Sequence, residues 1–332
     1  MHIYKPAYFD TFRCIAAQCP DSCCKEWEVE VDAASAAMYR QLEGPLGDRL
    51  REVLRDDPDW GTVMTIENHR CPMWRQDGLC RIQAELGHEA LCKTCRDFPR
   101  LRHDYGKFQE WGLELACPEA ARIILSAKDV AMTEEILPGS EPCEYDEEVM
   151  EILLRTRSEA LALLGDHKYS VPQALSMLLY YGYHTQSLID DGEAPLFCPE
   201  LSLSEATNFA KPGGEQALLN VFAELEILSP QWKNRLHSPL SPAPWQEEFR
   251  NLARYFVERY WLQAVSDYDL ISRVKFTVVS CILVRLLGGD LVETAQCYSK
   301  EIENSDQNVD ILLDSAYTSP ALTDRMLLGM LI

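Results

Sequence analysis

Cysteine is the residue type whose number and spacing in this sequence could support chemistry. Nine of the 13 cysteines fall within residues 14–117 of the 332-residue chain. Intervals of a few residues, as in Cys19-x3-Cys23, let thiolates converge on one ion or cluster, which fits an iron–sulfur cluster or tetrahedral zinc. In a reducing compartment, such density indicates metal rather than a disulfide framework or ordinary buried cysteine. The dense group is Cys14, Cys19, Cys23, Cys24, Cys71, Cys80, Cys92, Cys95 and Cys117, and the others are Cys143, Cys198, Cys281 and Cys297.

Four other motifs of chemical interest are absent from this sequence or lack their usual context. Radical S-adenosylmethionine enzymes carry Cys-x3-Cys-x2-Cys, but Glu26 stands where the third cysteine would follow Cys23. The pair Cys92-x2-Cys95 has the spacing of a thioredoxin-type redox motif, but no βαβ pattern surrounds it. Neither a G-x-G-x-x-G fingerprint nor a Walker A loop occurs, so the usual nucleotide-binding motifs are missing. A cysteine-based metal centre is the chemistry that the sequence favours.

Histidines and aromatic residues give two weaker candidate sites. His69, His88 and His103 lie among the cysteines and could ligate metal, although the cysteines already exceed what one centre needs. Aromatic faces attract an ammonium group, so an aromatic set could line a channel for lysine. Aromatic residues at helical spacing also pack in cores, and both interpretations stay open. This set consists of Tyr180, Tyr181, Tyr183 and His184.

Short hairpins must position the N-terminal cysteines. Alternating apolar and acidic residues over 27–32 predict a half-buried strand, and residues 33–42 then read as a helix. The turn signal at 76–78 places Cys71 and Cys80 across a tight hairpin, and a second hairpin through the strand 108–116 delivers Cys117. Such a unit has little core of its own, so we expect a metal centre to organise it.

The period of the apolar residues becomes helical from about residue 146 onward. Gly165 ends the first of these helices, and Ser170 is an N-cap for a helix through residue 190. An apolar face runs from Trp245 to Ala264, and another helix opens near Asp267 and stops at residues 288–289. Two more helices are predicted over 291–304 and 310–332. We therefore expect a mainly α protein, in which a small Cys-rich, metal-organised unit (1–125) precedes an all-α helical domain (126–332).

Acidic residues dominate the charge of the chain. The net charge is −22, and residues 121–332 hold 32 acidic against 16 basic residues. Such a surface repels phosphate backbones and anionic membranes, so the sequence predicts no nucleic-acid and no membrane partner and favours a lysine-bearing one. We find no secretory signal, and the apolar run 276–284 is far shorter than the ~20 residues of a membrane span. We therefore expect a cytoplasmic protein.

The order of residues around the cysteines resembles the flagellin lysine-N-methylase family. The matching segments are 12–14 (FRC), 19–27 (CPDSCCKEW), 71–73 (CPM), 77–82 (DGLCRI), 86–87 (LG), 95–100 (CRDFPR) and 117–122 (CPEAAR). Residues 152–164 and 170–179 are similar to the helical region of that family with weaker specificity. The resemblance implies a bacterial cytoplasmic enzyme that methylates lysine amines of flagellin with S-adenosylmethionine and carries a [4Fe-4S] cluster.

The resemblance also implies a set of candidate metal ligands. Cys92 departs from the family pattern, which commonly has a small polar residue there. A cubane takes four thiolates, so eight candidates leave room for a second metal site or for structural and redox thiols. The alternative is a non-catalytic zinc- or iron-chelating protein with Cys-Cys clusters, which would have no reason to bind S-adenosylmethionine. The implied metal ligands are Cys14, Cys19, Cys23, Cys24, Cys71, Cys80, Cys95 and Cys117.

Overall fold

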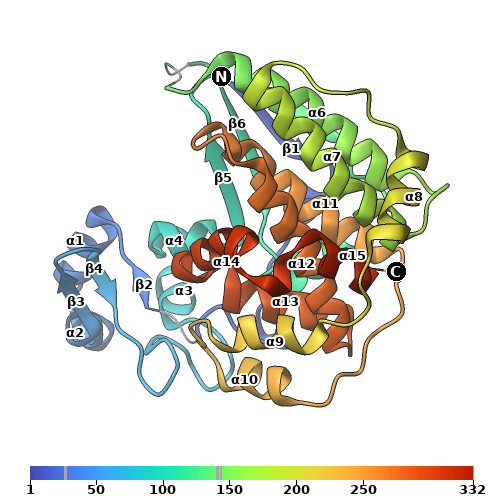
Figure 1. Ribbon diagram of the computed structural model, residues 1–332. Helices are drawn as coiled ribbons and strands as arrows, with labels where there is room; N and C mark the ends of the chain where they lie inside the picture. Colours follow the sequence, from blue (N-terminus) through green and yellow to red (C-terminus); the bar gives the residue numbers. More distant parts are fainter. Residues whose placement is uncertain (26–27, 140–141, 143, 332) are drawn as a thin grey trace.

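The computed structural model describes residues 1–25, 28–139, 142 and 144–331 (Figure 1). The protein is mainly helical, as expected from the sequence, with 58% of its residues in helices. Two small sheets lie in the N-terminal part of the chain. Within the described residues, every helix is too short or too polar to traverse a bilayer.

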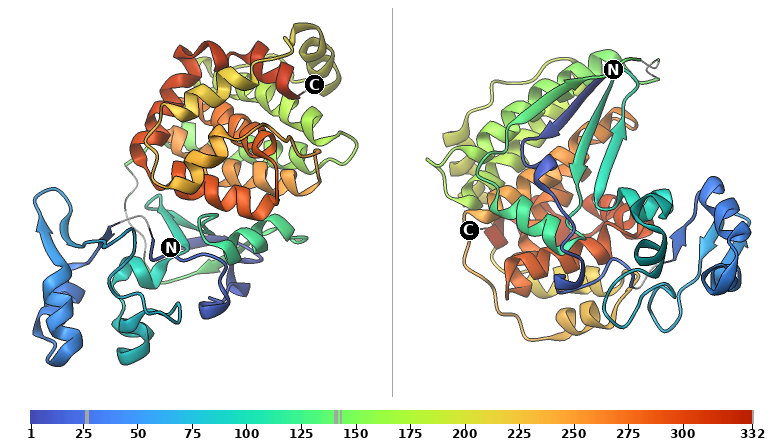
Figure 2. Two further views of the ribbon diagram at one scale, coloured as in Figure 1. Left: turned by 90° about the horizontal axis from the view of Figure 1, so that it is seen from below. Right: turned by 180° about the vertical axis from the view of Figure 1, so that it is seen from behind.

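The larger sheet is a mixed four-stranded sheet with the order β5-β6-β1-β7. Strands β5 and β6 form the expected antiparallel hairpin, in which Leu101 pairs with Gly112 and His103 with Glu110. Strand β1 pairs in parallel with β6 and antiparallel with β7, and neither pairing was predicted. Helices cover one face of this sheet (Figure 2). Its strands are β1 (His2–Pro6), β5 (Arg100–Asp104), β6 (Phe108–Leu113) and β7 (Met132–Ile136).

A second, smaller unit built on residues 29–64 projects beside the helical body, between the first four and the last five cysteines of the dense group (Figures 1 and 2). The predicted helix 33–42 is confirmed, and its N-cap Asp32 accepts a hydrogen bond from the backbone N–H of Ser35. The predicted strand at 27–32 is reduced to two residues, and Trp27 lies outside the described residues. The elements are β2 (Val29–Glu30), α1 (Ala33–Gln41), α2 (Gly44–Val53), β3 (Leu54–Asp57) and β4 (Gly61–Met64).

This small unit has a hydrophobic core of its own, so the expectation that it lacks one was wrong. Val31, Tyr39, Leu50 and Met73 are all almost completely buried there. The core was missed because its side chains come from four short segments, none of which has a clear period. The Tyr39 hydroxyl donates to the Ala90 carbonyl at 2.7 Å, which ties the unit to the chain beyond it.

Three short helices connect the two sheets with the helical body. The turn before the first of them is confirmed: Gly78 has a positive φ of 80°, and Trp74 forms an antiparallel bridge with Cys80. The helices are α3 (Arg81–Leu86), α4 (Lys93–Asp97) and α5 (Pro118–Ser126).

The described residues beyond 146 form helices and connecting loops. Ser170 caps its helix in a capping box with Gln173, as predicted. The single helix expected over 310–332 was wrong, because Ser319 and Pro320 break it into two. The helices are α6 (Glu147–Gly165), α7 (Val171–Asp191), α8 (Pro199–Phe209), α9 (Glu215–Ala223), α10 (Pro230–His237), α11 (Glu248–Tyr260), α12 (Leu270–Leu287), α13 (Leu291–Ile302), α14 (Asp306–Thr318) and α15 (Asp324–Leu331).

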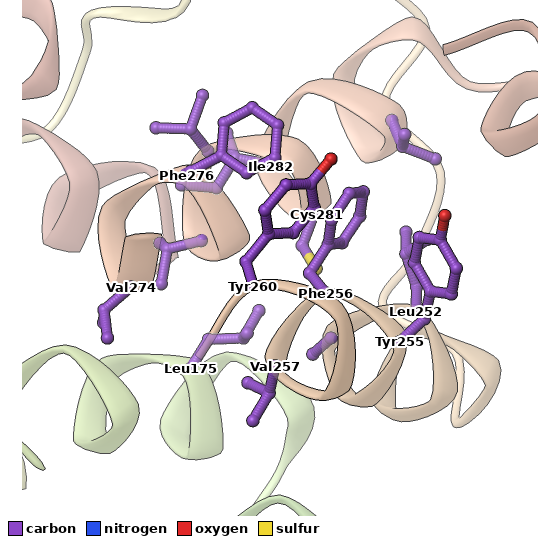
Figure 3. Packing of buried hydrophobic residues seen from close by; sticks show 14 of the residues in the cluster. Leu175, Leu252, Tyr255, Phe256, Val257, Tyr260, Val274, Phe276, Cys281 and Ile282 are labelled. Atoms are coloured by element: carbon purple, nitrogen blue, oxygen red, sulfur yellow. The ribbon is translucent and has the colours of Figure 1, made fainter. Parts of the chain in front are cut away.

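Helix α12 lies at the centre of the helical body and is buried on almost every side, as the apolar run predicted. Figure 3 shows Phe256 and Tyr260 of α11 packed against Phe276 of α12, with Leu175 of α7 nearby. The rings of Tyr260 and Phe276 meet edge to face with centroids 5.0 Å apart, a favourable aromatic geometry. This packing fixes α11, the helix that faces the larger sheet.

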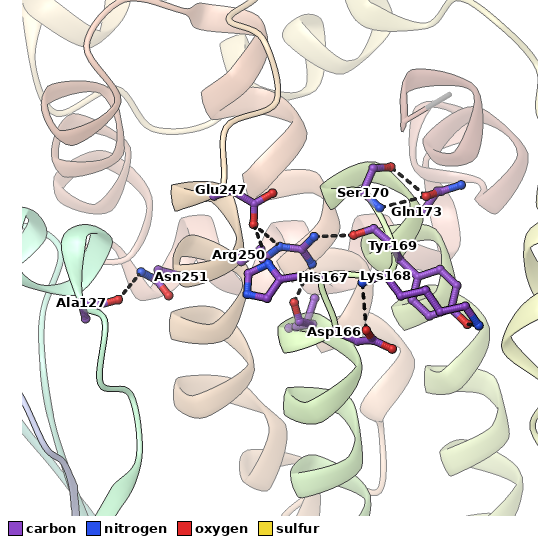
Figure 4. Close-up of polar contacts among 11 residues, drawn as sticks. Ala127, Asp166, His167, Lys168, Tyr169, Ser170, Gln173, Glu247, Arg250 and Asn251 are labelled. Atoms are coloured by element: carbon purple, nitrogen blue, oxygen red, sulfur yellow. Dashed lines mark hydrogen bonds and ion pairs between the residues drawn. The ribbon is translucent and has the colours of Figure 1, made fainter.

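Buried polar contacts hold α11 to its neighbours (Figure 4). The guanidinium of Arg250 donates to the carbonyls of Leu164 and Tyr169, on both sides of the loop between α6 and α7. Asn251 donates to the carbonyls of Leu125 and Ala127 at 2.9 and 3.0 Å, at the end of α5. These donors satisfy carbonyls that a helix end leaves without partners, so α11 is held to α5, α6 and α7 together.

Candidate functional site

The cysteines of the N-terminal part come from loops and helix starts. All twelve cysteines in the described part of the chain are free thiols, and Cys143 lies outside it. Cys80, Cys92 and Cys117 are the N-cap residues of α3, α4 and α5. Backbone N–H groups and the helix dipole at such positions stabilise a thiolate. Three helix starts therefore place a sulfur beside free backbone N–H groups, although burial still raises the pKa of Cys80 and Cys117.

Two groups of thiols make direct contacts with each other. The thiol of Cys24 contacts those of Cys23 and Cys71, and the Cys92 thiol contacts that of Cys95. The backbone N–H of Cys71 also donates to the Cys24 carbonyl at 2.8 Å, which fixes the two loops side by side.

Electrostatic influence between the sulfurs joins these groups into one cluster. Burial is the main cause that raises the pKa of Cys80, and the charges of Cys23 and Cys92 add to the rise, so Cys80 is close to both groups. The contact with Cys92 and burial raise the pKa of Cys95, and the charges of Cys24 and Cys71 add to that rise. The fold thus brings six cysteines from residues 23 to 95 together, which we call the thiol cluster: Cys23, Cys24, Cys71, Cys80, Cys92 and Cys95.

Three further cysteines surround this cluster. Besides burial, the charges of Cys14 and Cys23 raise the pKa of Cys19, and the charges of Cys19 and Cys23 raise the pKa of Cys117. These sulfurs are therefore close to one another. All eight cysteines singled out by the family resemblance are thus neighbours in space, and Cys92, which the resemblance set aside, joins them. Their role as metal ligands stays a prediction.

Burial and contacts between the sulfurs raise the pKa of most of these thiols, whereas the contact with Cys24 lowers the pKa of Cys71 and the contact with Cys95 lowers that of Cys92. The pKa of Cys24 is raised to about 12: the contact with Cys23 lowers it, but the contact with Cys71 and burial outweigh that effect. Burial is the main cause that raises the pKa of Cys117 to about 12. A bound cation favours the deprotonated form of these sulfurs, because the negative thiolates compensate the charge of the metal.

The donor set fits a soft metal centre. Thiolates select zinc, copper(I) and iron–sulfur clusters over magnesium or calcium. Among the residues that the structure describes, no three His, Cys, Asp or Glu side chains stand in the arrangement that holds one metal ion. In a cubane each thiolate binds a different iron atom, so the ligands of such a cluster do not converge on a single point. The thiol cluster could hold such a group.

The histidines proposed as ligands are placed differently. His69 and His88 are exposed on the loop before Cys71 and in the 3₁₀ turn before Cys92. The ring of His103 lies on β5 and faces a cavity between the sheet and the helices.

Helix α13 docks on the thiol cluster through an ionic network. Asp21 forms ion pairs with Lys25 at 2.9 Å and with Lys300 of α13 at 3.0 Å. Gln296 of the same helix donates to Asp21 at 3.1 Å and to the Ala116 carbonyl at 2.9 Å. Burial raises the pKa of Asp21, but the two lysines outweigh it and hold that pKa at about 2. The helical body and the cysteine loops are therefore joined beside Cys23.

A second polar site was not found from the sequence. Between the larger sheet and helices α6 and α11 lies a cavity of about 60 Å³ that opens partly to solvent. Buried ionisable groups of this kind concentrate at functional sites. The alternation of residues along the two strands is the one feature of the sequence that could have indicated this site. It places Leu101 and His103 on β5 on the same face as Glu110 and Gly112 on β6. The cavity is lined by residues from β1, β5, β6, β7, α6 and α11 and from the loop after β1, among them Tyr8, His103, Glu110, Gly112, Arg157, Tyr255, Glu258 and Arg259.

The aromatic set on α7 packs against other residues. Tyr181 donates to Glu159 at 2.5 Å, and its ring stacks with those of His184 and Trp261. Tyr183 donates to Asp324 at 2.8 Å. Neither these residues nor Tyr180 line the cavity.

Comparison with known proteins agrees with this description. Two proteins named Lysine-N-methylase, from Salmonella typhimurium and Salmonella choleraesuis, are each 31% identical to the chain over 142 residues, which is 41% of this chain and 35% of the relative. The chain therefore matches about a third of the length of these relatives. The Flagellar biosynthetic protein FliU of Salmonella muenchen is 32% identical over 133 residues, which is 38% of this chain and 79% of that protein. No family model and no solved structure matches the chain.

The fold and the site define a mainly helical protein with a mixed sheet and a thiol-rich centre whose loops are held to helix α13. The chain belongs to the flagellin lysine-N-methylase family.

Proposed function

We propose that this protein is a protein-lysine N-methyltransferase that acts on flagellin with S-adenosylmethionine as methyl donor. The observation that carries the proposal is the similarity to the Salmonella proteins named Lysine-N-methylase and FliU. The thiol cluster supports it, because the family resemblance rests on the segments that contain these cysteines.

The proposed reaction sets two requirements for the protein. A lysine ε-ammonium has a pKa near 10.4 and no lone pair, so a proton must leave it before nitrogen can attack a methyl group. The site must also attract the cationic side chain. The excess of 16 acidic residues in positions 121–332 provides long-range attraction for a lysine-bearing surface.

We also propose that an iron–sulfur cluster is bound by the thiol cluster. The support is the donor chemistry of six neighbouring thiols, among which Cys24 contacts both Cys23 and Cys71. When bound, such a group would supply a redox-active centre and would join the small unit to the loops before α3 and α4. One cubane takes four of these six thiols, so the other two, together with Cys14, Cys19 and Cys117, would lie outside it.

The test is incubation of purified flagellin with the protein and S-adenosylmethionine, followed by mass spectrometry. We expect mass steps of one methylene group each, confined to lysine residues. Binding of S-adenosylmethionine by calorimetry separates the methylase from a metal-chelating scaffold. Unmodified flagellin together with no binding of S-adenosylmethionine would contradict the proposed function and favour the scaffold.

A further inference from the structure

The cavity beside the larger sheet exists because a glycine stands where a side chain would fill it. Gly112 lies within β6 on the face that carries Glu110, whose carboxylate reaches helix α6. A Cβ atom at Gly112 would meet no atom within 4 Å, so the space in front of it is open. Glycine weakens a strand interior, and it commonly marks a position where a ligand approaches the backbone. The volume of about 60 Å³ is several times what one water molecule needs.

Most charges in the wall of this cavity are paired. Arg157 binds Glu110 through two hydrogen bonds of 2.7 and 2.5 Å. Arg259 forms an ion pair of 3.3 Å with Glu303, whose side chain is completely buried. These pairs leave neither guanidinium free to bind an anion and neither carboxylate free to bind a cation.

Glu258 is the carboxylate of the wall that remains weakly bonded. Its one ion pair, to Arg254 of the same helix, spans 3.5 Å. The ring of Tyr8 and the unpartnered Nε2 atom of His103 belong to the same wall. An ionised Glu258 therefore faces a partly apolar space, with Arg254 at 3.5 Å as its ion-pair partner among the described residues. A protonated amine has the charge, the donors and the size to enter that space.

We propose that this cavity binds a primary amine, the end of the substrate lysine side chain, and that Glu258 removes its proton. The inference rests on the proposed methyltransferase function and assigns its amine site and its base. In the step, an N–H bond of the ammonium breaks and the proton moves to a Glu258 oxygen. The lone pair left on nitrogen then forms the bond to the donor methyl group while the C–S bond breaks, which leaves a neutral thioether and a methylated ammonium. Glu258 finally returns its proton to solvent.

The surroundings of Glu258 suit this role near neutral pH. Burial raises the pKa of Glu258 to about 7, against the opposing charges of Arg254 on α11 and Arg157 on α6. The charge of Glu110 on β6 also raises the pKa of Glu258. Burial is the main cause that raises the pKa of the Tyr8 hydroxyl, and the charge of Glu258 adds to it. A base is most effective when its pKa lies near the working pH. Transfer of the proton also converts a buried ion pair into two neutral groups, which a desolvated site favours.

The experiment measures binding of n-butylamine, which has the length of the lysine side chain, by calorimetry at about pH 8.5, where the Glu258 carboxylate is ionised. We expect saturable binding that Glu258→Gln weakens at least about tenfold, the loss typical of a removed charged partner. The matched control is Glu248→Gln, an exposed carboxylate at the start of the same helix, which should bind as the wild type does. Gly112→Val fills the cavity without a change of charge and should also abolish binding.

A second readout separates this inference from the proposed function. If flagellin is methylated, the wild-type rate should rise with pH through about 7, and Glu258→Gln should remove that rise and slow the reaction. Amine binding that Glu258→Gln and Gly112→Val leave unchanged would overturn the inference even where the wild type methylates flagellin. Amine binding that both variants abolish, in a protein that methylates nothing, would uphold the amine site and reject the methylase.

Discussion

Glu258→Gln should stabilise the protein at alkaline pH. An acid whose pKa rises from 4.5 to about 7 on folding binds more protons in the folded than in the unfolded state between these values, so stability falls as pH rises through that window. The loss amounts to roughly 1.4 kcal/mol at about pH 5.5 and roughly 3 kcal/mol at about pH 8.5. Glutamine has nearly the same shape and no charge, so the variant escapes the loss. Its advantage over the wild type should grow by roughly 2 kcal/mol between the two pH values.

Urea unfolding followed by tryptophan fluorescence measures this difference. Trp261 follows α11 directly and is buried, so its emission reports on the helix that carries Glu258. Glu248→Gln is the control and should show the same difference from the wild type at both pH values. A Glu258→Gln variant that is less stable than the wild type at about pH 8.5 would refute the reasoning, because the buried carboxylate would then have stronger partners than Arg254 at 3.5 Å.

Three other predictions concern the thiol cluster, the helical body and the surface. Cys80→Ser should reduce both the iron content and the thermal stability of anaerobically purified protein. The control Cys198→Ser, at an exposed cysteine far from the thiol cluster in sequence, should leave the iron content unchanged. Equal iron loss in both variants would reject the cluster assignment. Arg250→Ala leaves the buried carbonyls of Leu164 and Tyr169 without their donor, so it should lower the free energy of unfolding by about 3 kcal/mol. A loss well under about 1 kcal/mol in urea unfolding would contradict the role of Arg250 in holding α11 to α6 and α7. Methyl transfer to flagellin should slow as salt shortens the Debye length from about 10 Å at 0.1 M to about 3 Å at 1 M, and a rate independent of salt would exclude steering by the acidic residues.

The helices and the turn before Cys80 could be predicted because both depend on local signals. Ser170 and Gly165 mark helix ends by their capping chemistry, and the structure has a helix end at each of them. The turn with Gly78, whose residues are adjacent in the sequence, precedes Cys80 as predicted, whereas the contact between Cys24 and Cys71 joins loops 47 residues apart and has no local signal. The core around Tyr39 was missed, since it is assembled from segments too short to show a period.

The cavity could not be predicted because its residues meet only through pairings between distant segments. β1 and β7 pair across more than 100 residues, and Arg157 reaches Glu110 from 47 residues away. Nothing in the sequence around Glu258 distinguishes it from the exposed glutamate at position 248 on the same helix. Its exposure and pKa depend on the packing of α11 against the sheet, which is a property of the complete fold.

Methyl transfer to flagellin measured against iron content tests the central claim most directly. Protein purified anaerobically and reconstituted to graded iron and sulfide content would be incubated with flagellin and S-adenosylmethionine, and methylated lysines counted by mass spectrometry. The account predicts that methylation rises in proportion to cluster content, with four irons per cubane. Full methylation by iron-free protein would contradict the cofactor assignment, and unmodified lysines with cluster-replete protein would contradict the assignment as a flagellin methylase.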